Sequence, residues 1–395
     1  MRTVGRCGFG TLTAHAEHER RHEAARELES FRPRPTSAIL VRWQLAGVRD
    51  VGANLRGLQL LTITCVEFGT FLGRRSERLV IRKKKSEETE VPLFRVGEIV
   101  VPSRGVSLSG ELIEAACERG IPITFVTSTG RPFAMLSSPM LTATVQTRRR
   151  QLAAFGESLG AEYCRLVVAG KLRNQAGFLT YGAKYLGVKD PQARARVKSC
   201  VTALRDARRS ALRVSGDKPD ALRGELMGIE GAAGRSYWNG ISALLGDNVV
   251  FEGRRHRGAA DPVNALLNYG YGILYARVWA SLLNAGLDPF AGFLHVDRPG
   301  KPSLVLDAIE EFRAPVVDRA VIAYVNQGRP VRFEGRLMSD ATRKAIAECV
   351  NERLSTRVVH RGRRIALQSV VQAQARSLAT FLRREGPYRP FTMYW

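Results

Sequence analysis

The sequence is short of cysteine, of long apolar runs and of acidic residues. Six cysteines are scattered through 395 residues with no C-x-x-C pair, which argues against a zinc ribbon, an iron–sulfur cluster or a disulfide framework. No apolar run reaches the roughly 18 residues of a membrane-spanning helix, and the N-terminus lacks the apolar core of a signal peptide. The chain is therefore expected to be a soluble cytoplasmic protein with no membrane partner.

The shortage of acids leaves a large positive charge. The chain has 61 Lys and Arg residues against 37 Asp and Glu residues, which gives a formal net charge of +24. Such a charge attracts phosphate-rich partners, and nucleic acid is the first candidate among them. A membrane surface would attract it as well, but no basic amphipathic helix or lipidation motif stands out. Nucleic acid is therefore the predicted partner.

Three regions of the chain differ in their residue patterns. Residues 1–60 are rich in charge and alanine and are predicted to form an N-terminal extension. Residues 61–142 contain β-branched and aromatic segments separated by turns, with one helix capped by Ser109. Residues 143–395 carry apolar residues three and four apart almost throughout. The sequence thus predicts an α+β fold, with a small N-terminal β domain followed by a larger all-α C-terminal domain.

The N-terminal extension contains one motif that suggests an enzyme. His18-Glu19-Arg20-Arg21-His22 matches the H-E-x-x-H pattern of zinc proteases. In those enzymes the helix that bears the motif packs an apolar face into the core. Here the neighbours are Ala, Glu and Arg, so a helix would have almost nothing to bury. A solvated helix or tail is therefore predicted in place of a zinc site.

One long helix is predicted between Asp261 and Gly286. Asp261 is a suitable N-cap, Pro262 suits the first helical position, and glycine is the usual residue just past a helix end. Within this helix Asn264 and Asn268 lie four residues apart and share a face. Amides inside an apolar helix need hydrogen-bond partners, so this pair indicates scaffolding beneath a site.

The segment SLVLDAIEEFRAP groups carboxylates near a histidine. It is predicted to be a helix of about three turns, capped by Ser303 and ended by Pro315. At about 100° per residue, Asp307 and Glu310 share the side opposite an apolar stripe, and His295 precedes them in a loop that can fold back. Carboxylates with an imidazole suit Mg²⁺ or Mn²⁺. The same pattern also fits a solvent-facing acidic stripe beside an ordinary loop histidine.

A further candidate carboxylate lies in DALRGELMGIEGAAGRSYW. Glu230 sits at the edge of an apolar stripe there, so its side chain is predicted to be half buried. Gly231 and Gly234 would let another element approach closely. This position fits a ligand, and it fits an ordinary glutamate at the boundary of a helix face equally well.

Taken together, these segments resemble the CRISPR-associated spacer-integration nuclease, the universal adaptation integrase of CRISPR systems. The matching segments follow the family's order: VPLFRVGEIVV, SLSGELIEAACERGIPITFVTSTGRP, RRRQL, AGKLRNQ, GIEGAAGRSYW, VNALLNYGYGILYARV, AGLDPFAGFLH and PSLVLDAIEEFRAPVVDR. The similarity covers residues 61–395, including the terminal YRPFTMYW, and is most specific over residues 264–319. Residues 1–60 have no counterpart in it.

The resemblance implies a metal-dependent DNA endonuclease and integrase. Such an enzyme inserts short foreign DNA fragments into the CRISPR array by attack of a 3′-hydroxyl on a backbone phosphate. It implies that Glu230, His295 and Glu310 are the catalytic metal ligands in the helical domain, with Asp307 as an adjacent acid. The family's glutamate segment commonly has alanine where this chain has Gly234, which is a small departure.

The resemblance also implies partners. These are double-stranded DNA, both as pre-spacer and as CRISPR repeat, a second copy of the chain in a homodimer, and a smaller second CRISPR adaptation protein. Arginines would hold the DNA by its phosphates. The candidates are Arg235, Arg254, Arg255 and Arg313, with further basic clusters at Arg74, Arg75, 148–150 and 361–364.

The alternative function is a non-catalytic nucleic-acid-binding scaffold that uses charge alone. It would bind nucleic acid in a salt-sensitive manner without any need for a divalent ion. The acids near Ser303 argue against it, because they would repel phosphate unless a cation lay between them.

Overall fold

The computed structural model describes residues 61–65, 68–83, 86–101, 105–127, 132–136, 145–186, 190–245, 249–255, 261–335 and 337–395. The predicted N-terminal extension, with its His18–His22 motif, lies outside the described residues. The predicted domain boundary at 142/143 also lies outside them.

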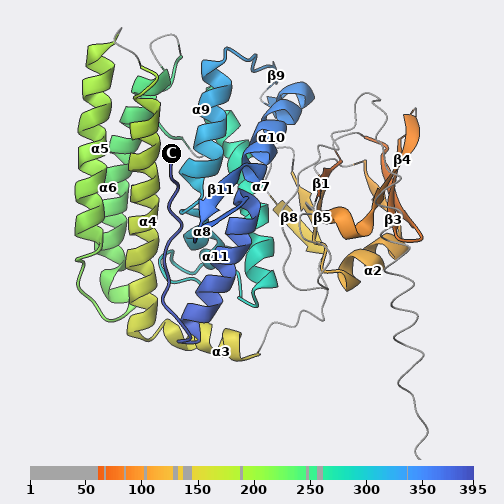
Figure 1. Ribbon diagram of the computed structural model, residues 1–395, viewed down its shortest axis with the longest axis horizontal. Helices are drawn as coiled ribbons and strands as arrows, with labels where there is room; N and C mark the ends of the chain where they lie inside the picture. Colours follow the sequence, from red (N-terminus) through yellow and green to blue (C-terminus); the bar gives the residue numbers. More distant parts are fainter. Residues whose placement is uncertain are drawn as a thin grey trace, which may run out of the picture. The chain divides into compact units, whose positions relative to one another are not determined.

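Two four-stranded sheets and one α-helix make up the described residues of the N-terminal part (Figure 1). The first sheet has the order β1-β5-β7-β8, in which β8 is the antiparallel edge strand; its members are β1 (Leu61–Thr64), β5 (Val96–Val101), β7 (Ile123–Val126) and β8 (Pro132–Leu136). The second has the order β4-β3-β2-β6; its members are β4 (Ser86–Pro92), β3 (Arg78–Lys83), β2 (Phe71–Arg75) and β6 (Ser107–Leu108). A short 3-10 helix, η1 (Leu93–Arg95), joins β4 to β5.

The two sheets share one apolar core with α2 (Gly110–Glu118). Alternate residues of β1, Leu61 and Ile63, are buried in it, as the period of two of a β-strand requires, and Leu72 of β2 joins them. The oxygen of the Ser109 side chain accepts from the backbone N–H of Leu112, so the predicted cap of this helix is confirmed.

Helices make up most of the remainder of the described chain (Figure 1). They are α3 (Val145–Ala154), α4 (Ser158–Gly182), α5 (Pro191–Ala211), α6 (Pro219–Leu245), α7 (Pro262–Asn284), α8 (Ser303–Ile309), the π-helix η2 (Arg313–Asp318), α9 (Arg319–Asn326), α10 (Asp340–Ser355) and α11 (Leu367–Leu382). The predicted fold class, a small β part followed by a larger helical part, is confirmed. Within the described ranges no helix is long and apolar enough to cross a membrane.

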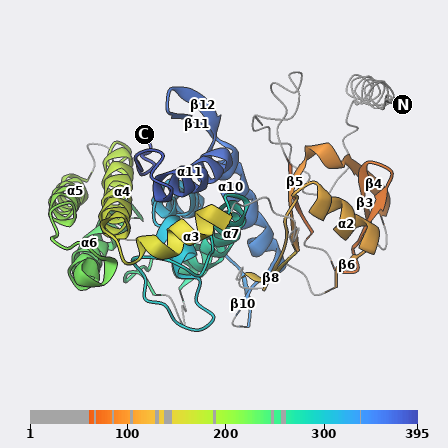
Figure 2. The ribbon, with the colours of Figure 1, turned by 90° about the horizontal axis from the view of Figure 1, so that it is seen from below.

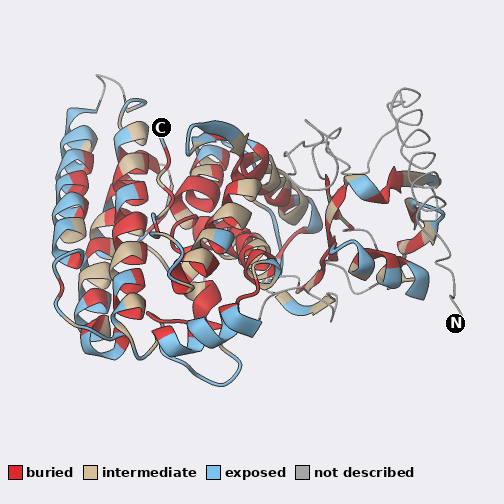
Figure 3. Ribbon diagram, turned by 60° about the horizontal axis from the view of Figure 1, so that its bottom comes forward, coloured by how far each residue is buried: buried red, intermediate tan, exposed pale blue. Residues whose placement is uncertain are grey.

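Helices α4, α5 and α6 pack against one another as a three-helix bundle (Figure 2). Helix α7 is buried along most of its length and contacts α8, η2, α9, α10 and α11, so it is the centre of the helical core. Its predicted bounds are confirmed: the Asp261 carboxylate accepts from the N–H of Asn264, Pro262 is the first helical residue, and Gly286 follows the end with a φ of 81°. Figure 3 shows that α5, in contrast, exposes a continuous outer face.

Two departures from the expected helices occur in this part. The helical pattern that begins after residue 143 is interrupted at 155–157, which separates α3 from α4. Two short hairpins interrupt the later helices; they are formed by β9 (Phe333–Glu334) with β10 (Leu337–Met338), and by β11 (Arg357–His360) with β12 (Arg363–Ala366). Strands of two to four residues carry too little periodic pattern to be distinguished from a loop.

One buried ion pair ties α7 to the first sheet. The guanidinium of Arg277 pairs with the carboxylate of Glu98 on β5 and donates to the hydroxyl of Thr62 on β1, at 2.7 Å. Glu98 is only 2% exposed, and burial raises the pKa of its carboxyl although Arg277 opposes this. A buried carboxylate needs such a partner, so this contact fixes where α7 meets the sheet.

Candidate metal centre

Three helical segments bring two carboxylates to one ammonium. The Nζ of Lys171 on α4 pairs with Glu230 on α6, and it lies 2.6 Å from an oxygen of Glu310 in the turn after α8. Glu230 is partly exposed, as predicted, whereas Lys171 and Glu310 are nearly buried, with side chains 11% and 7% exposed. The two predicted acidic ligands, 80 positions apart in the sequence, therefore face the same cation.

The charges at this centre keep Glu310 ionised. Burial raises the pKa of its carboxyl, but Arg313, Lys171 and His295 together outweigh burial and lower that pKa to about 2. Arg313 is the closest guanidinium, with its Nε 3.1 Å from the carboxylate. Burial also lowers the pKa of Lys171, and the two glutamates outweigh that effect and raise it. At neutral pH the centre therefore holds charged groups that neutralise one another.

His295 is held in place by Asp307. The Nδ1 of His295 lies 2.7 Å from Oδ1 of Asp307, and the backbone N–H of His295 donates to the same oxygen at 2.9 Å. The other oxygen, Oδ2, accepts from the N–H groups of Phe293 and Leu294 at 2.7 and 3.0 Å. A carboxylate oxygen that accepts from Nδ1–H leaves Nε2 as the nitrogen that a metal ion can bind when the imidazole is neutral. Carboxylate partners on the far nitrogen are typical of metal-ligating histidines.

The interpretation of an acidic stripe facing solvent is wrong. Asp307 is fully buried, Glu310 is 6% exposed, and neighbouring Glu311 is fully buried. Each oxygen of the Asp307 carboxylate accepts two hydrogen bonds, all of them from His295 or from the adjacent backbone N–H groups. Asp307 therefore lies behind the histidine and positions it, while Glu310 faces the cation.

The loop that bears His295 is pinned on its other side by Arg223 of α6. The guanidinium of Arg223 donates to the carbonyl oxygens of Leu294 and Phe293 at 2.8 and 3.0 Å. Gly292 lies so close to α8 that a Cβ atom there would fall 2.5 Å from the backbone carbon of Ser303. Only glycine fits at this position, because any side chain would separate the loop from the helix.

Ser303 is not the cap of α8. It is the first helical residue, after Pro302, and its hydroxyl accepts from the N–H of Gly292 at 2.9 Å and donates to the carbonyl of Phe290. The predicted cap was wrong because the hydroxyl bonds the incoming loop and not its own helix. The consequence is a second clamp on the loop that bears His295.

Pro315 does not end the helical path either. The chain continues through it as the π-helix η2 into α9. Pro315 has no N–H to donate to the carbonyl of Glu311, and the amide of Asn174 on α4 donates to that carbonyl instead, at 2.8 Å. The carbonyl of Pro315 accepts from Arg353 at 2.7 Å. Both partners come from remote segments, so a local stop signal was a poor guide here, and a π-helix beside a site is a recurrent arrangement.

Glu311 points away from the centre into a buried network. Its carboxylate accepts from the hydroxyl of Tyr388, from the backbone N–H of Phe391 at 2.7 Å and from the amide of Gln374 at 3.0 Å. Burial nevertheless raises the pKa of Glu311 to about 7. This carboxyl thus binds the C-terminal segment to the helix that carries Glu310.

Replacing Glu311 with glutamine should remove a pH dependence of stability. Because the folded pKa, about 7, exceeds the ordinary glutamate value of 4.5, the folded state binds more protons between these values, and the free energy of unfolding falls as pH rises through that window. The variant should lack this loss, so its stability relative to wild type should rise by on the order of 3 kcal/mol between about pH 5 and about pH 8. Urea unfolding at both pH values measures this change in the free energy of unfolding.

Glu162→Gln, an exposed change on α4, is the control. Equal pH profiles of stability for the wild type and Glu311→Gln would contradict the expectation.

Arg254 and Arg313 lie beside the centre. Arg254 donates to the amide oxygens of Asn264 and Asn268, at 2.9 and 2.6 Å, so the predicted need of these amides for partners is met. The guanidinium groups of Arg254 and Arg313 lie 5.1 and 4.8 Å from the ring of Tyr271. The Tyr271 hydroxyl in turn donates to the buried carboxylate of Asp318. The two arginines are therefore held in place by α7.

The other predicted DNA-binding arginines lie on the surface. Arg235 is exposed on α6, and Arg255 is exposed and pairs with Glu252 at 2.6 Å. Arg74 pairs with Glu77 in the turn after β2, and Arg75 pairs with Glu88 and Glu90 of β4. The arginines of 148–150 and 361–364 are exposed. A role of any of these residues in binding DNA stays a prediction.

Lys171 and Arg223 are site residues that the sequence patterns did not single out. Arg223 precedes Glu230 by seven residues, which is two helical turns, so the two share one face of α6. Lys171 follows the apolar run VVAG in the middle of a helix, and a cation at such a position needs a partner. Either signal could have indicated a link to a buried carboxylate.

The donor set fits a divalent cation in its chemistry. It offers two carboxylates and the Nε2 of an oriented imidazole, and a positive charge already stands between the carboxylates as the ammonium of Lys171. Across the described residues, no three or more His, Cys, Asp and Glu side chains are arranged to hold a metal ion. A divalent ion could therefore take this position only if the ammonium of Lys171 withdrew.

The sequence matches one family of known proteins over most of its length. The family model described as "CRISPR associated protein Cas1" matches residues 63–352. The CRISPR-associated endonuclease Cas1 1 of Archaeoglobus fulgidus is 33% identical over 347 residues, which cover 83% of this chain and 98% of that protein. The CRISPR-associated endonuclease Cas1 of Korarchaeum cryptofilum is 32% identical over 321 residues, which cover 80% and 93%.

Solved structures share the fold. A CAS1 protein from Thermotoga maritima matches with a TM-score of 0.66 at 22% identity, over 83% of this chain and 98% of that one. A casposase bound to integration product matches with a TM-score of 0.68 at 21% identity, over 84% of this chain and 92% of that one. The matches span the β part and the helical part alike.

Proposed function

Because this chain belongs to the Cas1 family of CRISPR-associated proteins, we propose that it is a divalent-metal-dependent DNA endonuclease and integrase that inserts short DNA fragments into a CRISPR array. The observation that carries the proposal is the convergence of Glu230 and Glu310 on one cation, beside a histidine whose Nδ1 is held by a buried carboxylate. Glu230 and Glu310 place two carboxylates together in a chain with a net charge of +24, where a phosphate-binding protein needs groups that hold a cation.

Glu230, Glu310 and the Nε2 of His295 would hold the ion, Mg²⁺ or Mn²⁺. When bound, the ion would polarise the phosphate and stabilise negative charge on the attacking and leaving oxygens. In the reaction the 3′-oxygen of the incoming strand forms a bond to phosphorus and a 3′-oxygen of the target strand leaves. Asp307 and Arg223 fix the loop of His295, and Arg313 places positive charge beside the carboxylates.

The direct test is a strand-transfer assay. Purified protein is incubated with a short DNA duplex and a plasmid bearing a CRISPR repeat, with Mg²⁺, with Mn²⁺ or with EDTA. The proposal predicts joined products with either metal and none with EDTA. The alternative, a non-catalytic scaffold, predicts salt-sensitive DNA binding that EDTA leaves unchanged and no joining under any condition.

The proposed assembly is a homodimer that joins a second CRISPR adaptation protein on double-stranded DNA. The proposal rests on membership of the Cas1 family, and the excess of exposed arginines supports the DNA partner. We propose further that the helical part of 143–395 holds the whole metal centre, since Lys171, Glu230, His295 and Glu310 all lie in it.

Replacing Lys171 with methionine should tighten the binding of Mn²⁺. The wild-type ammonium must leave the two carboxylates before a metal ion can enter, and methionine removes this competitor at similar volume. We expect about 10-fold higher Mn²⁺ affinity, and without metal a loss of about 3 kcal/mol in stability, because two carboxylates lose their buried counter-ion.

Electron paramagnetic resonance of free Mn²⁺ measures the affinity, and urea unfolding measures the stability. Lys184→Met, an exposed change just beyond the end of α4, is the matched control. An unchanged Mn²⁺ affinity in Lys171→Met would show that the ammonium and the ion do not share a position.

A further inference from the structure

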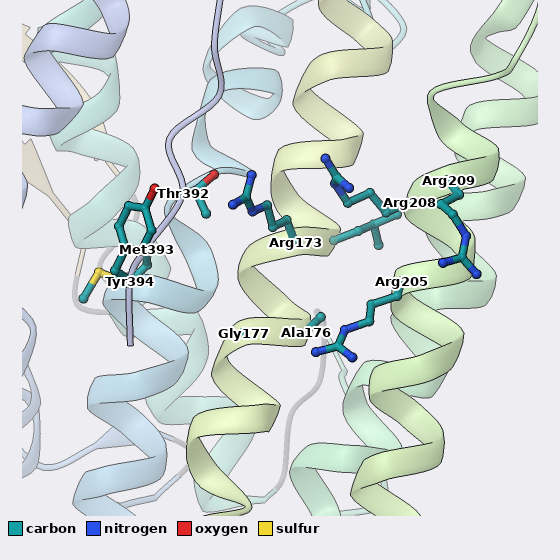
Figure 4. A pocket seen from close by; sticks show the side chains of 10 residues that line it. Arg173, Ala176, Gly177, Arg205, Arg208, Arg209, Thr392, Met393 and Tyr394 are labelled. Atoms are coloured by element: carbon teal, nitrogen blue, oxygen red, sulfur yellow. The ribbon is translucent and has the colours of Figure 1, made fainter. Parts of the chain in front are cut away.

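A second basic site lies on the other side of α4. A cavity of about 420 Å³ opens between α4, α5 and the C-terminal segment, and Figure 4 shows arginines from both helices around it. Its lining includes Arg173 of α4, Arg205, Arg208 and Arg209 of α5, and Tyr394 of the C-terminal segment. These five residues are called the arginine pocket below. Its volume is typical of a site for a small ligand or one unit of a polymer.

The arginine pocket is not part of the metal centre. Lys171, which faces Glu230 and Glu310, precedes Arg173 by two positions on α4. At about 100° per residue the two side chains leave the helix on nearly opposite sides. Figure 4 shows Arg205 and Arg208 extending from α5 toward α4, into the space on this other side.

The positive charge of the arginine pocket is left unbalanced by its own lining. The residues around the cavity include no Asp or Glu. Arg209 pairs with Asp206, but among the described residues Arg173, Arg205 and Arg208 have no ion pair or side-chain hydrogen bond. The Nε of Arg208 is buried and has no hydrogen-bond partner there. These guanidinium groups can therefore take an acceptor that the described part of the chain does not supply.

An exposed aromatic ring, that of Tyr394, lines the same cavity from the C-terminal segment (Figure 4). Tyr394 is 72% exposed although the preceding residues of its segment pack into the core. Proteins that bind single-stranded nucleic acid combine two elements. Basic side chains bind the phosphates, and exposed aromatic rings stack on the bases. A smooth duplex would use the cations but would have no unpaired base to stack on the ring.

The surface around the arginine pocket extends this pattern. Helix α5 bears six cationic side chains and a single carboxylate, Asp206. Arg194 and Lys198 are exposed on the same helix, outside the cavity lining. They would add long-range attraction for a polyanion without touching the bound nucleotide.

We propose that the arginine pocket binds a single-stranded segment of nucleic acid, with phosphates on Arg173, Arg205 and Arg208 and a base stacked on Tyr394. The choice of nucleic acid over another polyanion rests on the proposed function; the pocket itself rests on the cavity, the unpaired guanidinium groups and the exposed ring. A protein that joins DNA ends would gain from it a place to hold an unpaired strand away from the metal centre.

The test is binding of a fluorescent single-stranded oligonucleotide, followed by anisotropy over a range of salt concentrations. The double variant Arg205→Gln/Arg208→Gln should bind about 10-fold more weakly, and the slope of log K against log salt should become shallower by about 1.4, the value for two lost phosphate contacts on a single strand. Tyr394→Ala should also weaken binding but should leave the slope unchanged, because stacking releases no counter-ions.

The matched control is Arg194→Gln/Lys198→Gln, which removes the same charge from the same helix outside the cavity. Circular dichroism melting checks that all the variants are folded, as expected for residues on the outside of α5. The proposal is overturned if the control weakens binding as much as Arg205→Gln/Arg208→Gln, if Tyr394→Ala has no effect, or if a blunt duplex loses as much affinity as the single strand.

Failure of the arginine-pocket proposal can be distinguished from failure of the proposed integrase function. Joining of DNA by the wild type, together with normal single-strand binding by Arg205→Gln/Arg208→Gln, would refute the arginine pocket alone. Binding through the pocket by a protein that never joins DNA would refute the integrase proposal alone.

Discussion

Replacing Glu230 with glutamine is expected to lower the rate of metal-dependent strand transfer by about 10³-fold while the protein stays folded. The carboxylate is one of two that face the shared cation position, and the neutral amide removes its charge at the same volume. A divalent ion would then be held by one carboxylate and one imidazole. The loss corresponds to about 4 kcal/mol in the activation barrier, which is in the range expected for a catalytic metal ion.

Glu225→Gln is the matched control for this change. Glu225 lies on the same helix, five positions before Glu230, and is exposed. Strand transfer by this variant should equal that of the wild type. Near-normal activity in Glu230→Gln, with Mg²⁺ as with Mn²⁺, would remove Glu230 from the ligand set.

Replacing Asp307 with alanine is expected to have the largest effect on stability. Three backbone N–H groups and the imidazole of His295 donate to this fully buried carboxylate, and alanine would leave all of them without a partner. We expect a loss of about 4 kcal/mol or more in the free energy of unfolding. Urea unfolding measures it, with Asp206→Asn as control: that carboxylate is in a surface ion pair, and its loss should cost under about 1 kcal/mol.

Asp307→Asn separates positioning of the histidine from folding. Its side chain has the same shape and should leave enough folded protein to measure Mn²⁺ binding. Because the amide cannot hold Nδ1–H as a carboxylate does, the Mn²⁺ affinity should fall by about 10- to 100-fold. A stability of Asp307→Ala within about 1 kcal/mol of the wild type would contradict the role given to this residue.

Local signals in the sequence were enough for the fold class and for several helix ends. The Asp261-Pro262 pair and Gly286 bound α7 because capping depends only on neighbouring residues. The half-buried position of Glu230 followed from the periodicity of its own helix. These features are decided within a few turns of chain, so one sequence carries the information.

The geometry of the centre could not be obtained in this way. The path through Pro315 depends on the amide of Asn174, which is more than a hundred positions away and satisfies the carbonyl that proline cannot. The burial of Asp307 depends on a loop that folds back over α8, and a helical pattern alone cannot distinguish a solvent-facing acid from one covered by a loop. Lys171 is a site residue only because α6 and the turn after α8 both reach it.

The most direct test of the metal centre is anomalous X-ray diffraction from crystals of the protein grown with Mn²⁺. We predict a single strong anomalous peak bounded by Glu230, Glu310 and the Nε2 of His295, with the ammonium of Lys171 withdrawn from between the two carboxylates. A structure in which Lys171 still bridges Glu230 and Glu310 at saturating Mn²⁺, with no anomalous peak beside His295, would contradict it.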